Sequence, residues 1–227
     1  MADVGDTFVE TAGDVALTAH TPTGGPPVGT GWTEEVNQSA TPADEKATVN
    51  ATSDTVMFLD GDGVIAIYSI QPNPTATEYD VDLTLKAITG GGDRGYGVIA
   101  RYTDANNYYY ACAKGADAPP DGEYQLHKRV AGTHTNLGRF VVQAAVNDVL
   151  NFRVRDSGDT LELFINTISR LTNTDTDLTV AGRWGKGWGA NNTEIDDSWE
   201  GDDFKGVEVA AAAVVIPSLA MAPYIPG

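Results

Sequence analysis

The sequence predicts an all-β protein that forms a sandwich of two antiparallel sheets, and three observations support this prediction. Apolar and polar residues alternate cleanly in several segments, as in 79–86, where one side is suited to a core and the other to water. Such segments recur at short intervals, separated by turns rich in Gly, Pro, Asn and Asp. No window has a helical period, and no internal repeat is present. We expect one domain at residues 1–206, within the 227-residue chain, and an extended arm at 207–227.

The clearest element is a β-hairpin at residues 94–114. Residues 96–102 and 108–113 are its two strands, and the polar segment 103–107 is its turn. One face of the first strand carries Tyr96, Val98, Ala100 and Tyr102, and alternate positions of the second carry Tyr108, Tyr110 and Cys112. Both halves are rich in aromatic and β-branched residues and neither contains proline, which favours a place in the middle of a sheet.

The other elements follow from the same pattern. Short strands are expected around residues 6–9, 14–21, 47–50, 56–59, 64–70, 124–130 and 135–142, with a Gly/Pro-rich bend leading to Trp32. A second hairpin carries Leu150, Phe152 and Val154 on one strand and Leu161, Leu163 and Ile165 on the other, around a turn at 156–159. A Gly/Trp-rich loop at 182–192 is then followed by two closing strands.

Several short motifs carry a resemblance to a known family. They are Ala-Arg-Tyr at 100–102 with Asp-x-Asn-Asn-Tyr-Tyr at 104–109, Leu-x-Leu-x-Ile-Asn at 161–166, Asp-Asp-Phe at 202–204, and an opening formed by Asp6, Phe8, Leu17, His20, Thr21, Pro22 and Trp32. This set resembles the concanavalin A-like jelly-roll domains of lectins and glucanases, including copies in bacteriophage structural proteins. The resemblance spans residues 6–206 and implies a jelly roll whose final strand, at 202–204, returns beside the first. It implies no catalytic role for the opening, which looks like a terminal strand and a loop pinned by the indole of Trp32.

Composition excludes some functions. The chain has 32 acidic and 14 basic residues, a net charge of −18, so nucleic acid is not expected as a partner. No apolar run is long enough to span a bilayer, and the first residues lack the basic and apolar segments of a secretory signal. We therefore expect a soluble protein made in the cytoplasm. Cys112, the single cysteine, cannot form an internal disulfide and is expected to be a buried strand residue.

Aspartates in turns suggest a cation site. Asp60, Asp62, Asp175 and Asp177, with Asp202 and Asp203, offer the hard oxygen ligands that Ca²⁺ prefers. Ordinary solvated turn aspartates explain the same residues, and none of them matches an EF-hand loop. The three histidines lack the spacing of a zinc helix, and no other cofactor is expected.

Three carboxylates are candidates for catalysis. Glu194, Asp196 and Glu200 would share one face of a strand, as the paired carboxylates of retaining glycoside hydrolases require. In glucanases of this fold, however, the second Glu occupies the place where this chain has Ser198 or Trp199. The chain also lacks a nucleophile elbow, a Cys-His arrangement and a phosphate loop, so we predict that it is not an enzyme.

Aromatic residues provide a candidate sugar site. Tyr109, Trp184, Trp188 and Trp199 would form a stacking platform for glycans if they are exposed, whereas the alternative is that two of the Trp residues pack against the loop in which they lie.

The last segment has a different composition from the rest. After Glu208 it has no charge, it contains three prolines, and its apolar side chains are Val214, Val215, Ile216, Leu219, Met221, Tyr224 and Ile225. Such an arm cannot bury itself in the sandwich, so we expect it to lie on a coat protein or on sister subunits of a homo-oligomer.

The sequence suggests two possible functions for this protein, and a third has less support. The arm favours a virion protein, a capsid decoration or accessory protein that displays its jelly roll. The alternative is a glycan-binding module for host attachment, and the third is a glycoside hydrolase.

Overall fold

The computed structural model describes residues 3–9, 14–23, 31–37, 47–50, 53, 55–58, 65–88, 94–115, 122–155, 159–190 and 199–209. All regular secondary structure in these residues is β-strand. The strands are β1 (Val4–Asp6), β2 (Val15–Ala16), β3 (Gly31–Asn37), β4 (Ala47–Asn50), β5 (Thr55–Phe58), β6 (Ile65–Gln71), β7 (Tyr79–Ile88), β8 (Arg94–Asp104), β9 (Asn107–Lys114), β10 (Glu123–Val130), β11 (Thr133–Val141), β12 (Val149–Arg155), β13 (Thr160–Ile165), β14 (Ile168–Thr174), β15 (Arg183–Ala190) and β16 (Trp199–Glu208). Within this part of the chain, no helix has the length and apolar character needed to cross a membrane.

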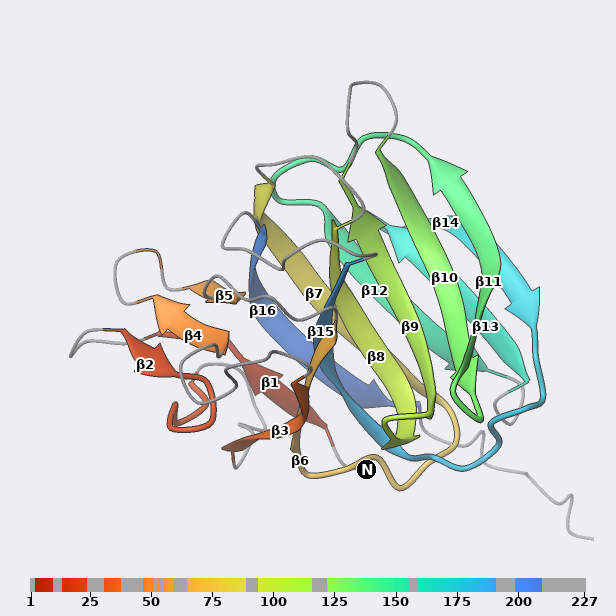
Figure 1. Ribbon diagram of the computed structural model, residues 1–227, viewed down its shortest axis with the longest axis horizontal. Coiled ribbons are helices and arrows are strands. Elements are labelled where there is room, and N and C mark those ends of the chain that lie inside the picture. The colour runs from red at the N-terminus through yellow and green to blue at the C-terminus, as the bar shows by residue number, and fades with distance from the viewer. Residues whose placement is uncertain are drawn as a thin grey trace, which may run out of the picture.

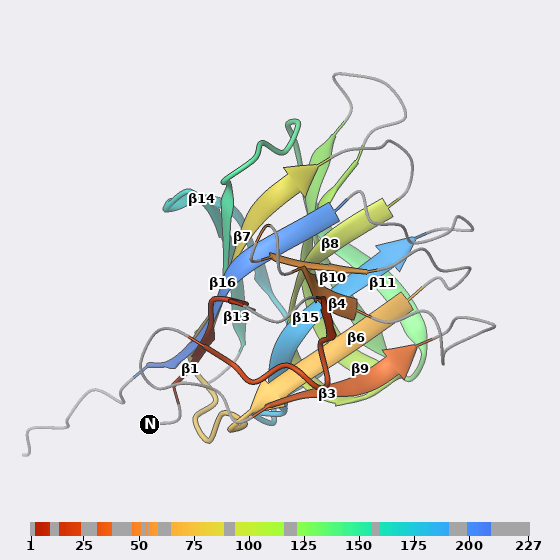
Figure 2. The same ribbon diagram turned by 90° about the vertical axis from the view of Figure 1, so that its left-hand side faces the viewer.

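The strands form two antiparallel sheets that pack face to face (Figures 1 and 2). Sheet A has nine strands in the order β14-β13-β12-β7-β16-β5-β4-β2, with β1 also paired to β16. Sheet B has seven strands in the order β11-β10-β9-β8-β15-β6-β3. The predicted two-sheet sandwich is confirmed.

Both predicted hairpins are confirmed. In sheet B, β8 pairs with β9 and places Ile99 opposite Tyr110, and in sheet A, β12 pairs with β13 and places Phe152 opposite Leu163. The turn of the first hairpin is shorter than expected, since β8 ends at Asp104 and β9 begins at Asn107. The Asp104 carboxylate tightens this turn by accepting hydrogen bonds from the Asn106 backbone N–H (2.7 Å) and the Asn107 amide (3.0 Å).

The prediction that Tyr102 shares a face with Tyr96, Val98 and Ala100 is wrong. A bulge separates Ala100 from Asp104 in the β8–β9 pairing, and Arg101 has a φ of 53°. Because a bulge inserts an extra residue into one strand, it reverses the alternation beyond it. Tyr96, Val98 and Ala100 therefore point into the core between the sheets, whereas Tyr102 lies in a separate apolar cluster on the outer face of sheet B.

The last strand lies beside the first, as the family resemblance implies. β16 pairs with β7 on one side and with β1 on the other, where Val4 lies opposite Gly206 and Asp6 opposite Phe204. The strand continues to Glu208, two residues past the expected domain boundary. The buried carboxylate of Glu208 accepts hydrogen bonds from Thr75 Oγ1 (2.7 Å) and the Ala76 backbone N–H (2.8 Å). These residues belong to the sandwich and not to the arm.

Three other elements differ from expectation. The Gly/Trp-rich segment at 182–192 was expected to be a loop but contains β15, a central strand of sheet B. β3 and β14 are edge strands, and their polar sequences lack the alternation that marks a half-buried strand.

Cys112 is buried in β9 as expected, and burial raises the pKa of its thiol to about 12.

Candidate functional site

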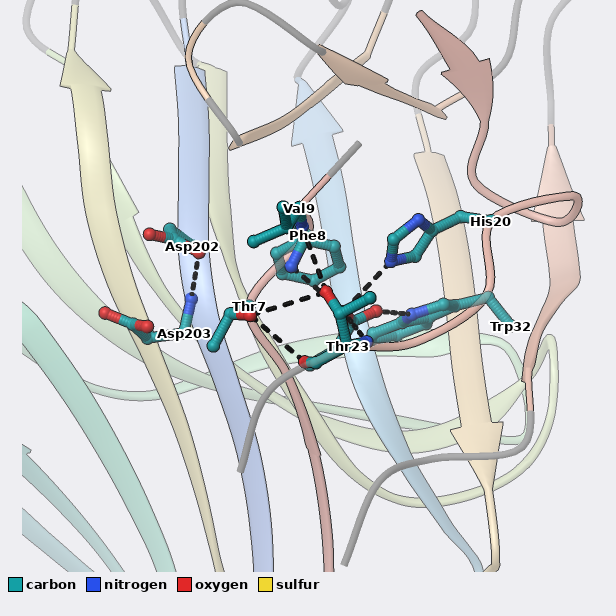
Figure 3. A network of polar contacts seen from close by, with 9 residues as sticks. Thr7, Phe8, Val9, His20, Thr23, Trp32, Asp202 and Asp203 are labelled. Atoms are coloured by element: carbon teal, nitrogen blue, oxygen red, sulfur yellow. Dashed lines mark hydrogen bonds and ion pairs between the residues drawn. The ribbon is translucent and has the colours of Figure 1, made fainter. Parts of the chain in front are cut away.

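A buried polar cluster holds the opening segment of the chain (Figure 3). Asp6, at the end of β1, accepts hydrogen bonds through Oδ1 from the Phe8 backbone N–H (2.9 Å), His20 Nε2 (3.0 Å) and the Thr23 backbone N–H (3.1 Å). Its Oδ2 accepts one from the Trp32 indole N–H (2.6 Å). Asp6, His20 and Trp32 are all buried, so the expected pinning of this loop by the indole is confirmed.

Lys186 completes this cluster from β15. Its ammonium lies 3.5 Å from the centre of the Phe8 ring and 4.4 Å from that of Trp32, so two aromatic faces contact the cation. Burial lowers the pKa of Lys186 well below its ordinary value, and the charges of Asp6 and Asp202 act in the opposite direction. The Gly/Trp-rich sequence around Lys186 does not reveal this role. The cluster is a structural clamp, and its polar groups are directed at one another.

The predicted platform of exposed aromatic residues is wrong for two of its four members. Tyr109 and Trp184 are fully buried between the sheets. The Tyr109 hydroxyl donates to Asp175 Oδ1 (2.7 Å), and the Trp184 indole donates to the Pro72 carbonyl (2.9 Å). Their polar atoms are satisfied inside the protein, which allows the large rings to enter the core. Trp188 and Trp199 lie in β15 and β16, and their side chains fall outside the described residues.

Two of the four candidate cation ligands meet a cation, but it is a side chain. Asp175 and Asp177 both bind the Lys128 ammonium, with Asp177 Oδ2 at 2.5 Å. Burial acts to raise the pKa of Asp175, but hydrogen bonds from Lys128 and Tyr109 lower it overall. Asp202 faces Lys86 at 3.6 Å, while Asp60 and Asp62 lie outside the described residues. In the described ranges no three His, Cys, Asp or Glu side chains converge as metal ligands, and Ca²⁺ binding stays a prediction.

Of the three candidate carboxylates for hydrolysis, the structure describes Glu200. Glu200 accepts hydrogen bonds from Thr55 Oγ1 (2.5 Å) and Ser53 Oγ (3.4 Å). Glu194 and Asp196 lie outside the described residues, as do all the arm positions, Val214, Val215, Ile216, Leu219, Met221, Tyr224 and Ile225.

The outer face of sheet B carries an apolar cluster that the sequence did not predict. We call it the outer strip, and its members are Val36, Ile65, Ile67, Ile99, Tyr102, Tyr108 and Tyr110. Ile99 lies between Val98 and Ala100, which belong to the inner core, so the strip must be on the opposite side of the sheet. Tyr102 and Tyr108 stack with ring centres 6.0 Å apart. Val36, Ile67, Ile99, Tyr102 and Tyr108 are buried, whereas Ile65 and Tyr110 are partly buried, so the accessible part of the strip lies at Ile65 and Tyr110.

The absence of a side chain at Gly187 of β15 leaves space in the middle of the outer strip. A Cβ at Gly187 would lie 3.5 Å from Ile67 Cγ1 and 3.8 Å from Ile99 Cγ2, so any side chain there would stand between these two residues. Tyr110 reaches across β8, and its hydroxyl donates to the Gly187 carbonyl at 3.0 Å. The ring is thereby held along the sheet. Tyr102 and Tyr108 are 2% and 5% exposed, whereas Tyr110 is half-buried and presents part of its ring to solvent.

Polar groups border the strip on the side of β3. The Glu35 carboxylate accepts from Ser69 Oγ (2.6 Å) and binds the Arg183 guanidinium, which in turn lies 5.6 Å from the centre of the Tyr102 ring. A donor and an acceptor therefore stand beside the buried Tyr102 ring. The signal that could have revealed this site is the Tyr108, Tyr110, Cys112 alternation, because Tyr109 takes the opposite, inward face.

Known proteins resemble the chain in fold and not in sequence. No family model matches it, and no curated protein matches it in sequence. Among solved structures, the carbohydrate-binding module CBM66 from Bacillus subtilis has a TM-score of 0.53 at 14% identity and covers 78% of this chain and 95% of its own. The carbohydrate recognition domain of Emp46p has a TM-score of 0.55 at 10% identity, with 79% and 89% covered.

A third structure is longer than this chain. A mutant of the GH43 protein BlXynB from Bacillus licheniformis has a TM-score of 0.58 at 12% identity and covers 90% of this chain but 39% of its own. At these identities the similarity establishes the fold alone, a two-sheet jelly-roll sandwich, as the sequence predicted.

Proposed function

We propose that this chain binds carbohydrate on the outer face of sheet B. The observation that carries the proposal is Tyr110, a partly exposed aromatic residue that packs on the buried members of the outer strip, on the side of the sheet that faces away from the core. Sites for small polar ligands combine apolar and aromatic surface with a few placed polar groups, which is the combination present here. The fold similarity to a carbohydrate-binding module and a carbohydrate recognition domain supports this choice.

Tyr110 is the residue that we assign to stacking against a sugar ring. It is the half-buried tyrosine of the strip, and its bond to the Gly187 carbonyl fixes its orientation. The apolar face of a pyranose can pack on such a ring, while Glu35 and Arg183 supply an acceptor and a donor for sugar hydroxyls. Lectin-type binding requires no reaction, and we propose that the bound glycan is left intact.

Replacement of Tyr110 by alanine is expected to weaken glycan binding at least tenfold, because the stacking surface is lost; tenfold corresponds to about 1.4 kcal/mol. Binding can be measured on a glycan array and then by calorimetry with the strongest ligand, which should be recovered unhydrolysed. Tyr110→Phe keeps the ring and should retain most of the affinity. Phe164→Ala is the matched control, since it removes a half-buried ring from β13 in the other sheet. Equal affinity of Tyr110→Ala and wild type would exclude this site.

Two points stay predictions. One is that the arm anchors the protein to a coat protein or to sister subunits, and the other is that the protein is part of a virion. A shortened chain that tests the role of the arm must keep Glu208, because Glu208 belongs to the sandwich. A chain that ends at Val209 is expected to unfold at the same temperature as the full chain but to lose its oligomeric state or its attachment to a particle. Light scattering and co-sedimentation measure these properties. Unchanged assembly of the shortened chain would show that the arm is not the anchor.

A further inference from the structure

A group of cationic side chains continues the outer face of sheet B beyond the outer strip. We call it the cationic edge, and it consists of Lys114 on β9, Arg129 on β10 and Arg139 on β11, with His127 and His134 beside them. The register places Arg129 opposite Tyr108 and His127 opposite Tyr110, so the cationic edge borders the tyrosines of the strip directly. Three of the 14 Lys and Arg residues thus gather on one face of a chain whose net charge is −18.

On strands β9, β10 and β11, the cations Lys114, Arg129 and Arg139 outnumber the single acidic side chain. Glu123 is the acidic side chain that shares the outer face of β10, and it lies 3.9 Å from Arg139 Nη1. Burial is the main cause that lowers the pKa values of both histidines; the charges of His134 and Lys114 lower the pKa of His127 further, and the charges of Arg129 and Lys114 lower that of His134. A face with this excess of positive charge attracts anions.

A chain of hydrogen bonds along β10 fixes the chemistry of His127. The Glu123 carboxylate can only accept, so it faces the amide NH₂ of Gln125, and the Gln125 Oε1 atom faces His127 Nε2. His127 Nε2 must therefore carry the proton, which leaves Nδ1 as an acceptor. His127 is 7% exposed, and its Nδ1 atom has no hydrogen-bond partner among the described residues.

Arg129 complements this acceptor. Its guanidinium donates to the Tyr108 hydroxyl, while its Nε–H has no described partner. One strand thus carries an acceptor and a cationic donor that lack described partners next to the same tyrosines, and both atoms are buried, so a ligand reaches them only when a covering side chain moves. The exposed ring of His134 stacks on His127 with ring centres 4.5 Å apart, and it is the group on the edge strand β11 that must turn aside to admit a ligand.

We infer that the glycan recognised by this face is anionic, a chain of sugars bearing carboxylate or sulfate groups, which lies along β9 and β10 from Tyr110 toward Arg129 and Arg139. This inference rests on the proposed carbohydrate binding and specifies its ligand class. A sugar acid supplies both missing partners, a hydroxyl that donates to His127 Nδ1 and an oxyanion that accepts from Arg129. From Glu123 to Arg129 the strand spans about 20 Å, so an oligosaccharide contacts several of these groups at once.

The test compares ligands that differ only in charge. The full-length chain is titrated with tetragalacturonate and its methyl ester, and with a sulfated tetrasaccharide and its desulfated form, at low and at physiological salt. We expect at least one anionic member to bind at least tenfold more tightly than its neutral counterpart, with an affinity that falls as salt is raised. Arg129→Gln and Arg139→Gln should each remove most of that preference. Lys205→Gln, which removes an exposed charge from β16 in the other sheet, should leave it unchanged.

Each remaining outcome bears on a different proposal. Equal binding of charged and neutral glycans, weakened by Tyr110→Ala but not by the arginine variants, would overturn the anionic class and keep carbohydrate binding. Binding to no glycan of either kind would overturn both. Equal binding of single-stranded DNA, lost in the same arginine variants, would show a general affinity for polyanions and would also overturn the assignment of a sugar ligand.

Discussion

Alanine at position 6 is expected to lower the free energy of unfolding by about 3–5 kcal/mol, the range seen when one partner of a buried charged pair is removed. The Asp6 carboxylate accepts four hydrogen bonds, including those from His20 and the Trp32 indole, and its removal leaves these buried donors without their acceptor. Its loss also leaves Lys186 with less negative charge nearby. Chemical denaturation followed by tryptophan fluorescence measures the change.

Two comparisons make this prediction specific. Asp6→Asn keeps the shape and one acceptor oxygen, so it should destabilise less than Asp6→Ala. Asp14→Ala removes an exposed carboxylate from the same part of the chain and should cost less than about 1 kcal/mol. A result in which all three variants unfold together with wild type would mean that the opening segment contributes nothing to stability.

The clamp also predicts a dependence on pH. Burial acts to raise the pKa of Asp6, but hydrogen bonds from His20, Trp32 and the Phe8 backbone, together with the His20 charge, lower it overall. A carboxyl whose pKa is lower in the folded state stabilises the protein above its unfolded pKa, and this contribution is lost as the pH falls through the folded value. The stability difference between wild type and Asp6→Asn should therefore be constant near pH 7 and shrink below about pH 4.

Alanine at Gly185 is expected to cost about 3 kcal/mol or more, at or above the upper end of the usual range for overpacking. An added Cβ would lie 2.0 Å from the Tyr68 carbonyl oxygen and 2.8 Å from Ser69 Cα. These atoms belong to the backbone of β6, the strand with which β15 pairs at this position. Since backbone cannot rotate out of the way as a side chain can, the two central strands of sheet B would have to separate locally.

Gly187→Ala, two residues along the same strand, is the matched control. There the added Cβ meets the Ala66 carbonyl at 3.0 Å and otherwise the Ile67 and Ile99 side chains at 3.5 Å or more. Small shifts can relieve such contacts, so thermal unfolding should separate the two variants by several degrees. Equal melting temperatures would mean that β15 is not held against β6 as described.

The sequence predicted those parts of the fold whose signal is local. The hairpin of β8 and β9 and that of β12 and β13 have an alternating pattern in both strands, and this pattern determines which residues pair across the turn. The bulge at Arg101 has no such signal, because Arg101 is a long charged residue that is nevertheless buried, with its guanidinium donating to the carbonyls of Leu178 and Thr77. Because the bulge was not predicted, the face of the sheet on which Tyr102 lies was also predicted wrongly.

The candidate site was harder to predict because it depends on residues far apart in the chain. Asp175 and Asp177 were recognised as partners for a cation, but that cation is Lys128, from a different strand. Tyr109 and Trp184 look like exposed aromatics in the sequence, and the partners that satisfy their polar atoms, Asp175 and Pro72, lie 66 and 112 positions away. The outer strip joins β3, β6, β8 and β9, which no local window contains.

The position of β16 also constrains how the protein folds as it is synthesised. β1 pairs with β16, and β5 joins sheet A through it, at Val56 opposite Gly201. β1 therefore has no partner in the sheet until about 200 more residues have been synthesised, which takes about 10–40 s at about 5–20 residues per second. During that time the unpaired edges of β1 and β7 are open to wrong pairing. Chaperone binding to the nascent chain, followed by rapid closure on release, is the behaviour that this topology leads us to expect.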